Sequence, residues 1–215
     1  MFKWLSGKSR FIRYPDNYAQ TDQVMIKQVC QCANQQLEQG DLVFVVVYFP
    51  AMFEQIQRAF DELGIEYQVV LNAIDFQANA TELARKPSEI RLALANSLLM
   101  ESPPGSSQST LEISMIMCEP IPLVRTEDEF NYALRHTPHM IKLGYFMSLE
   151  HALVKYCLTD KMMILLEQLG IGKHELISSE LISRRVRTRL SQLQGKRDQW
   201  DDADSAEEWL RINLS

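Results

Sequence analysis

The apolar stretch LVFVVVY, residues 42–48, narrows the possible folds of this chain more than any other stretch. It has the length of a strand but lacks the alternation of apolar and polar residues that a half-exposed strand shows, which is typical of a strand buried on both faces of a parallel sheet. Pro50 suits the first turn of a helix. The next apolar residues recur at helical spacing: Phe53, Ile56, Phe60 and Leu63. We therefore expect a buried strand that leads directly into a helix.

The alternation of strand and helix continues as far as residue 148. Thr21 is a suitable N-cap for a first helix, which is expected to end near Gly40 because glycine readily adopts the left-handed conformation that follows many helices. Strands separated by helices indicate an α/β fold with a doubly wound, mainly parallel sheet and helices on both faces. The pattern predicts further strands at 67–73, 89–100, 111–122 and 142–148, helices at 81–86 and 125–136, and a loop at 101–110.

Beyond Ser148 the pattern predicts helices only. Ser148 is expected to cap the first of them, and a longer helix is expected within 178–196. Residues 197–215 are rich in Asp and Glu, which predicts a solvated tail whose Trp200 and Trp209 could bind a partner. The chain then divides into four parts: a basic, aromatic strap at 1–20, the α/β domain at 21–148, a helical segment at 149–196 and the acidic tail at 197–215.

Composition and charge exclude several classes of protein. The net charge of −6 argues against nucleic acid as the main partner, because binding phosphates needs a clustered basic face. No apolar run approaches ~20 residues, so no membrane-spanning helix is expected. The four cysteines show no metal-binding spacing, and the first residues lack the features of a secretory signal, so we expect a cytoplasmic protein without structural disulfides.

The strap at 1–20 has two interpretations. Basic residues are interleaved with aromatic and aliphatic ones, Trp4 among them, and such a segment can lie on an anionic membrane surface. Residues 2–13 would then make a peripheral contact at the inner face of the membrane. Alternatively, the strap packs its aromatic side chains onto the domain, as many chain termini do.

Two longer stretches resemble a known family. GDLVFVVVYFPAMFEQIQRAFDELGIEYQVVLNA, which begins at residue 40, is similar to the opening of the second motor domain of SecA, the ATPase that drives preproteins through the bacterial translocon. GYFMSLEHALVKYCLTDKMMILLEQLGIGKHELISSELISRRVRTRLSQL, which begins at residue 144, resembles the SecA segment that leaves this domain and enters the helical scaffold. The order and separation of the two agree with SecA over residues 20–195. The resemblance implies a RecA-like helicase C-terminal domain, one of the P-loop NTPase folds.

The chain departs from this family where the family holds ATP. The phosphate-binding loop G-x-x-x-x-G-K-[ST] occurs nowhere in the sequence, and the family's glycine-rich segment is replaced by SLLMESP at 97–103. The family's arginine fingers, which neutralise charge on the transferred phosphate, correspond to Thr137 and Met140, and neither residue carries a positive charge. The resemblance therefore implies a pseudo-ATPase with no catalytic residue, no cofactor and no metal. The remaining candidates for a nucleotide contact are Asn72, Asn96 and Arg135.

Arg135 and the pair His136 and His139 also have plain structural interpretations. Arg135 could contact a phosphate or form a surface salt bridge with one of the acidic residues at 127–129. His136 and His139 could suggest a metal pair, but Pro138 disrupts helical spacing and no third ligand lies nearby in the sequence. We therefore interpret them as loop histidines.

The run RRVRTR contains the most concentrated positive charge. On a helix whose apolar face holds Leu181, Val186 and Leu190, the arginines form a solvated outer face, attract acidic lipid or RNA, or pair with the acidic tail. Because the scaffold helix of SecA continues for many more turns, a helix that stops near Gly195 is expected to leave apolar surface for a partner. The proposed interaction surface consists of Trp4, Arg184, Arg185, Arg187, Arg189, Trp200 and Trp209.

These observations lead to three hypotheses of function. The first is a non-catalytic SecA-like module that binds a protein: a translocase motor, a secretion component or a second copy of the chain. The second is one half of a composite ATP site that a separate motor chain completes. The third is a membrane-surface adaptor that uses the basic N-terminus.

Overall fold

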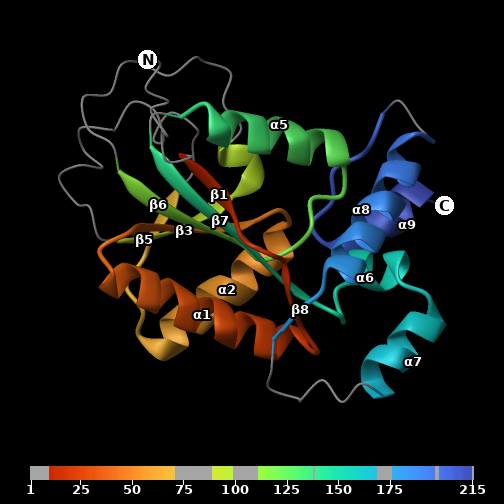
Figure 1. Ribbon diagram of the computed structural model, residues 1–215, viewed down its shortest axis with the longest axis horizontal. Coiled ribbons are helices and arrows are strands. Elements are labelled where there is room, and N and C mark those ends of the chain that lie inside the picture. Colours follow the sequence, from red (N-terminus) through yellow and green to blue (C-terminus); the bar gives the residue numbers. More distant parts are fainter. Residues whose placement is uncertain are drawn as a thin grey trace, which may run out of the picture.

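The computed structural model describes residues 10–70, 89–98, 111–137, 139–168, 176–196 and 199–214. These residues form one eight-stranded sheet with helices on both faces (Figure 1). The strands are β1 Phe11–Arg13, β2 Asn17–Ala19, β3 Leu42–Val47, β4 Gln68–Val70, β5 Ile90–Leu94, β6 Glu112–Met117, β7 Met140–Ser148 and β8 Ile177–Ser178. The helices are α1 Asp22–Glu38, α2 Pro50–Leu63, α5 Val124–Arg135, α6 Ala152–Cys157, α7 Asp160–Gln168, α8 Glu180–Gln194 and α9 Ala206–Leu214, with a 3₁₀ turn, η1, at Ala95–Leu98.

The strand order is β4-β5-β3-β6-β7-β2-β8, and β1 also pairs with β7. All pairings are parallel except that of β2 with β8. The central strand, β3, pairs with β5 on one side and β6 on the other, and its residues are buried throughout. The predicted fold class, a doubly wound and mainly parallel sheet with helices on both faces, is confirmed.

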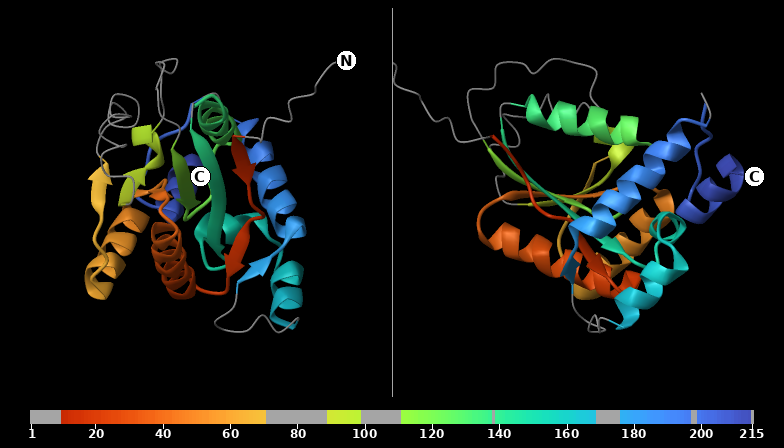
Figure 2. Two further views of the ribbon diagram at one scale, coloured as in Figure 1. Left: turned by 60° about the vertical axis from the view of Figure 1, so that its left-hand side comes forward. Right: turned by 45° about the vertical axis from the view of Figure 1, so that its right-hand side comes forward.

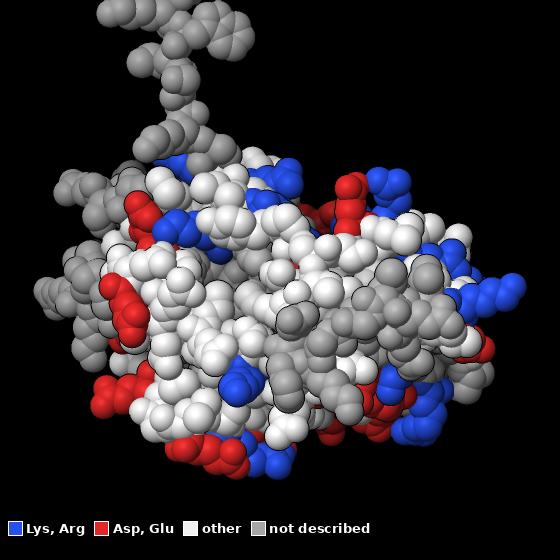
Figure 3. All heavy atoms as spheres, turned by 60° about the horizontal axis from the view of Figure 1, so that its bottom comes forward, with Lys and Arg blue, Asp and Glu red and all other residues white. Residues whose placement is uncertain are grey.

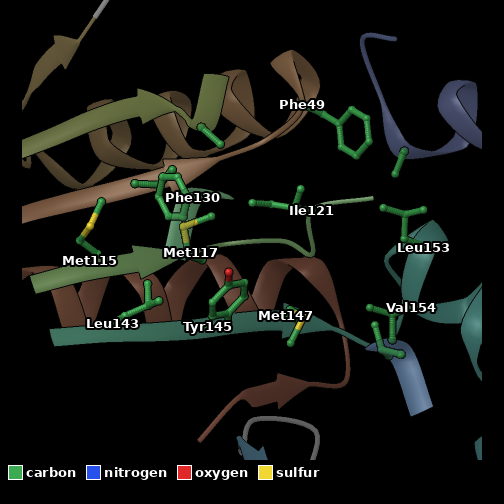
Figure 4. Packing of buried hydrophobic residues seen from close by; sticks show 14 of the residues in the cluster. Phe49, Met115, Met117, Ile121, Phe130, Leu143, Tyr145, Met147, Leu153 and Val154 are labelled. Carbon is green, nitrogen blue, oxygen red and sulfur yellow. The ribbon is translucent and has the colours of Figure 1, made fainter. Parts of the chain in front are cut away.

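Helices lie on both faces of the sheet (Figure 2), and each layer contains its own hydrophobic cluster. On one face α1 and α2 pack against the side chains of Val43, Val45 and Val47. On the other face α5, α6, α8 and α9 share a larger cluster with alternate residues of β6 and β7, part of which is shown in Figure 4. Only alternate residues of β6 and β7 join this cluster, because successive side chains of a strand point to opposite faces of the sheet.

Capping residues mark the start of α1 and both ends of α2. Thr21 Oγ1 accepts a hydrogen bond from the backbone N–H of Val24 at 3.2 Å, which satisfies one of the free donors of α1. Pro50 occupies the first turn of α2, and Gly64 ends it in the left-handed conformation with φ of 65°. These predictions are confirmed.

Several predicted boundaries are wrong, because strands end where their neighbours end. The strand predicted at 89–100 stops at Leu94, opposite Val47, and continues as η1. The strand predicted at 111–122 stops at Met117. Ser148 is the last residue of β7 rather than a helix cap, and α6 begins after His151.

The described part of the predicted N-terminal strap forms part of the sheet. β1 and β2 extend the sheet along β7, and Tyr18 and Ala19 are fully buried. The interpretation of the strap as a segment packed on the domain therefore holds for residues 10–19. Residues 1–9, including Trp4, lie outside the described residues, as do Asn72, the helix predicted at 81–86 and the loop predicted at 101–110.

The C-terminal region differs most from its prediction. Residues after 148 are not helical throughout, because β8 pairs with β2. The end of the chain is not a solvated tail: α9 buries Trp209 to 2% exposure, and the ring of Trp200 stacks on it at 5.2 Å. The prediction was based on the high proportion of acidic residues, but Ala206, Trp209 and Asn213 recur at helical spacing and form the buried side of α9.

The apolar face of α8 is covered by the chain itself. Ile182, Val186, Leu190 and Leu193 are all buried in the cluster that α5, α6 and α9 share with the sheet. Leu181, which we assigned to this face, points to solvent and is 66% exposed. The expectation that α8 leaves its apolar face for a partner is therefore wrong.

Candidate functional site

The carboxyl ends of β3 and β6 mark the place where this fold class usually binds a ligand. Strands that follow β3 in the chain lie on both of its sides, so the direction of winding reverses between β3 and β6. In open α/β sheets the crevice outside the carboxyl ends of such a pair commonly holds the ligand. The turn from β3 into α2 passes through Tyr48 and Phe49, whose backbone N–H groups lie where a phosphate would be bound.

These two backbone N–H groups already donate hydrogen bonds to a side chain of the protein. Glu119, which follows β6, is 1% exposed, and its Oε1 accepts hydrogen bonds from the backbone N–H groups of Tyr48 and Phe49, both at 2.6 Å. Its Oε2 lies 3.0 Å from Nε2 of His151, which is also buried. A carboxylate that accepts two backbone N–H bonds uses the same donors that an oxyanion ligand needs. The turn therefore binds an internal anion.

The first turn of α2 is likewise satisfied from within the chain. Pro50 has no N–H to offer, and the N–H of Ala51 donates to the carbonyl of Asp204 at 2.9 Å. The next two N–H groups donate to the carbonyl of Phe49. Since a helix N-terminus attracts anions through such free donors, this one has little left with which to bind phosphate.

The segment that supplies Asp204 is held firmly over this edge of the sheet. The side chain of Asn213 accepts from the N–H of Asp201 at 2.9 Å and donates to its carbonyl at 3.0 Å. Burial of the Tyr48 phenol raises its pKa, and the nearby carboxylates of Asp202 and Glu119 raise it further. The last helix, α9, lies beside α6 and α8 at the end of the sheet where the parallel strands finish (Figure 1).

Asn96 and Arg135, the two described candidates for a nucleotide contact, do not lie together at the carboxyl ends of β3 and β6. Asn96 lies in η1, just past the carboxyl end of β5. Arg135 is the last residue of α5, and its guanidinium lies 5.0 Å from the ring of Phe11, which pairs with Ile141 near the start of β7. Because the strands are parallel, Asn96 and Arg135 lie at opposite ends of the sheet.

The residues at the expected finger positions have local roles. The hydroxyl of Thr137 donates to the carbonyl of Leu134 at 3.1 Å, and Met140 begins β7. The ring of His139 is buried, and its Nδ1 accepts from the N–H of Leu111 at 3.3 Å, whereas the ring of His136 lies tilted against that of Tyr132, with 4.0 Å between their centroids. Among the described residues, no group of three His, Cys, Asp or Glu side chains is placed to hold a metal ion.

The arginines of the RRVRTR run contact other parts of the chain. Arg187 bonds to Glu127 at 2.9 Å and to Asp128 at 2.7 Å, so the acidic partners lie on α5 rather than in the C-terminal segment. Arg184 pairs with Glu180 at 2.7 Å on its own helix. The remaining two bind near α6: Arg185 Nε donates to the carbonyl of Cys157, and Arg189 lies 5.5 Å from the ring of Tyr156.

Charges are mixed on the face of the molecule shown in Figure 3. Blue and red side chains both occur around its rim and white atoms separate most of the blue ones, so the described part of this face carries no broad basic patch. The acidic residues 127–129, which were one of the two alternatives for a partner of Arg135, are bound by Arg13, Arg187 and Arg125. In the part of the chain that the structure describes, no helix has both the length and the apolar character needed to cross a bilayer.

Sequence reasoning missed the residues that close this site, namely Glu119, His151 and Asp204. One signal was available: Glu119 is a lone acidic residue within the apolar stretch IMCEPIPLV, and a carboxylate there must find donors when it is buried. Its partners Tyr48 and Phe49 are far away in the chain, and only the pairing of β3 with β6 brings them together.

Two of the three comparisons with known proteins found no match. No protein-family model matches it, and no curated protein matches it. Among solved structures it is similar to the C-terminal part of the Fun30 ATPase domain, with a TM-score of 0.44 and 7% identity, over 78% of this chain and 54% of that chain. This chain thus spans about half the length of that structure.

Proposed function

We propose that this chain is a non-catalytic, RecA-like module that acts by binding another protein of the bacterial protein-translocation machinery. The partner is a translocase motor, a secretion component or a second copy of the chain. The observation that carries the non-catalytic part of the proposal is the carboxylate of Glu119, which takes the two backbone donors of the Tyr48–Phe49 turn.

The physical argument is one of competition for donors. A phosphate would have to displace a buried carboxylate that makes two short hydrogen bonds and contacts His151, and it would have to separate Ala51 from Asp204. Displacement leaves the buried Glu119 side chain without its hydrogen-bond partners, which costs on the order of 3–5 kcal/mol. The sequence also lacks a phosphate-binding loop. Translocation is proposed from the resemblance of the two stretches to SecA.

Nucleotide binding and hydrolysis by the purified chain test the non-catalytic part. We expect no saturable binding of a fluorescent ATP analogue and no ATP hydrolysis above that of a matched blank. Hydrolysis that disappears in Arg135→Ala, but persists in Arg125→Ala at the other end of the same helix, would contradict the proposal.

Calorimetric titration with the purified SecA motor tests the partner. A saturable complex in which the motor keeps its own ATPase rate would support a binding module. Hydrolysis that appears only in the mixture, from a motor whose own Arg fingers are removed, would instead support a composite ATP site. The absence of any complex with the motor would contradict the translocase motor as partner.

A further inference from the structure

A groove of about 390 Å³ lies on the face of the sheet that carries α1. Its floor is formed by β6 and β7, and its walls are α1 on one side and the segment that joins β1 to β2 on the other (Figure 2). Cavities that bind small molecules typically measure roughly 300–1,000 Å³. The apolar part of its described lining includes Tyr14, Pro15, Cys32, Ile116, Gly144 and Phe146.

A glycine lies at the floor of this groove, in the middle of β7. Glycine weakens the interior of a strand, and it is usually found there for a left-handed backbone, a bulge or the close approach of other atoms. The first reason does not apply, because the described glycines with positive φ are Gly40 and Gly64. The second does not apply either, since Gly144 pairs with Ile116 in the regular register of β6 and β7.

The space above Gly144 is open within the described part of the chain. A Cβ atom added there would meet only Cε2 of Phe146, at 3.8 Å, which is an ordinary van der Waals distance. An alanine would therefore fit, and it would suit a strand better than glycine does. Gly144 is also partly exposed, whereas its two neighbours in β7 are buried on the opposite face of the sheet. The reason that remains is the close approach of a molecule from outside the chain.

The groove offers no free charge to a ligand. Lys142 is the one charged side chain among its described lining residues. Its Nζ contacts the two carboxylate oxygens of Asp41 at 2.9 and 3.2 Å, and an oxygen of Glu112 at 3.0 Å. Because an ammonium group has three N–H donors, an anion would find none of them free. A cation would meet no carboxylate in the described lining, so the groove favours an uncharged molecule.

We propose that this groove binds a small, uncharged aromatic molecule, whose planar ring lies flat on the backbone of Gly144. A flat ring can approach a peptide backbone closely only where no side chain intervenes. The aromatic side chains of Tyr14, which is 48% exposed, and Phe146 then contact the bound ring, and Cys32 borders it on the side of α1. This inference is independent of the proposed function, because the groove lies apart from the turn of Tyr48 and Phe49.

Titration with three related probes tests the shape and charge of the ligand. The probes are 2-naphthol, its saturated and puckered counterpart decahydro-2-naphthol, and the anion 2-naphthoate. We expect 2-naphthol to cause saturable NMR shifts at the residues of α1, β6 and β7 that line the groove, and to bind at least about fivefold more tightly than the other two. Equal or tighter binding of either of the other probes, 2-naphthol shifts located elsewhere, or no saturable binding of 2-naphthol would overturn the proposal.

Side chains added at the floor of the groove test the position of the ring. Gly144→Ala should weaken 2-naphthol binding about three- to tenfold, because its methyl group holds the ring away from the backbone, and Gly144→Val should weaken it further. The melting temperature of Gly144→Ala should equal or exceed that of the parent protein, since the added methyl meets no clash.

Gly195→Ala is the matched control, because Gly195 lies at the end of α8 and its added Cβ would meet only the carbonyl of Gln192, at 3.9 Å. This variant should leave the affinity for 2-naphthol unchanged. The alanine variant at position 144 decides the matter if the valine variant does not fold. Unchanged affinity in Gly144→Ala would overturn the assignment. A melting temperature of Gly144→Ala below those of the parent and of Gly195→Ala would do the same, because the fold itself would then require the glycine.

Discussion

Glu119 Oε2 lies 3.0 Å from Nε2 of His151, and both side chains are almost completely buried. The same carboxylate binds the backbone of the turn between β3 and α2 through its other oxygen. One side chain thus joins β3, the segment after β6 and the start of α6. The site that would hold a ligand in many α/β proteins is a structural junction here.

Replacing Glu119 should therefore destabilise the fold. Glu119→Ala leaves the buried N–H of Phe49, the partly buried N–H of Tyr48 and the His151 ring without their partner, and we expect a loss of about 3–5 kcal/mol in the free energy of unfolding. Glu119→Gln keeps an oxygen for the turn and should cost less. Urea denaturation measures both, with Glu62→Ala on the exposed side of α2 as control. A loss in Glu119→Ala no greater than that of Glu62→Ala would show that the junction does not stabilise the fold.

Truncating Trp209 should cost about 3–5 kcal/mol, because a fully buried indole leaves a large cavity. Trp200→Ala removes a partly exposed ring from the same stack and should cost less, about 1 kcal/mol. Denaturation followed by far-ultraviolet circular dichroism compares the two variants. If Trp209→Ala were as stable as the parent protein, the C-terminal helix would be a solvated tail, as the acidic composition suggested.

Stability should fall as the pH drops below about 6.5, partly because of His139. Burial lowers the pKa of His139 in the folded protein below its ordinary value of 6.5, so between the two values the unfolded chain binds a proton that the folded protein does not. Above pH 6.5 both states are neutral, and the effect vanishes. His139→Gln should flatten the pH dependence of the unfolding free energy in this window. The exposed His136 provides the control, and a His136→Gln variant that flattens it equally would argue against this assignment.

The ion pairs of Arg187 should stabilise the contact between α5 and α8. Arg187→Ala loses bonds to two carboxylates and should lower the free energy of unfolding by about 1 kcal/mol at low salt, and by less at high salt. Arg184→Ala removes an exposed pair within α8 and should cost at most about 0.5 kcal/mol. Denaturation at two salt concentrations distinguishes them. Equal losses would mean that the link between the helices contributes nothing of its own.

Local patterns were enough to predict the centre of the fold. The uninterrupted apolar run of β3, the N-cap at Thr21, Pro50 at the start of α2 and Gly64 at its end depend on residues a few positions apart. Such features follow from backbone geometry and from the burial of one strand, so they can be read without knowing what lies nearby. The alternation of strands and helices predicted the class of sheet for the same reason.

Tertiary structure alone decided what fills the ligand position and what the ends of the chain do. Glu119 meets Tyr48, and Asp204 meets Ala51, only because strand pairing and helix docking bring distant segments together. The same holds for β1 and β2, whose short strands depend on hydrogen bonds to β7, and for Trp209, whose acidic neighbours suggested exposure. A side chain's burial depends on the elements that pack against it, and composition in a short window carries no information about them.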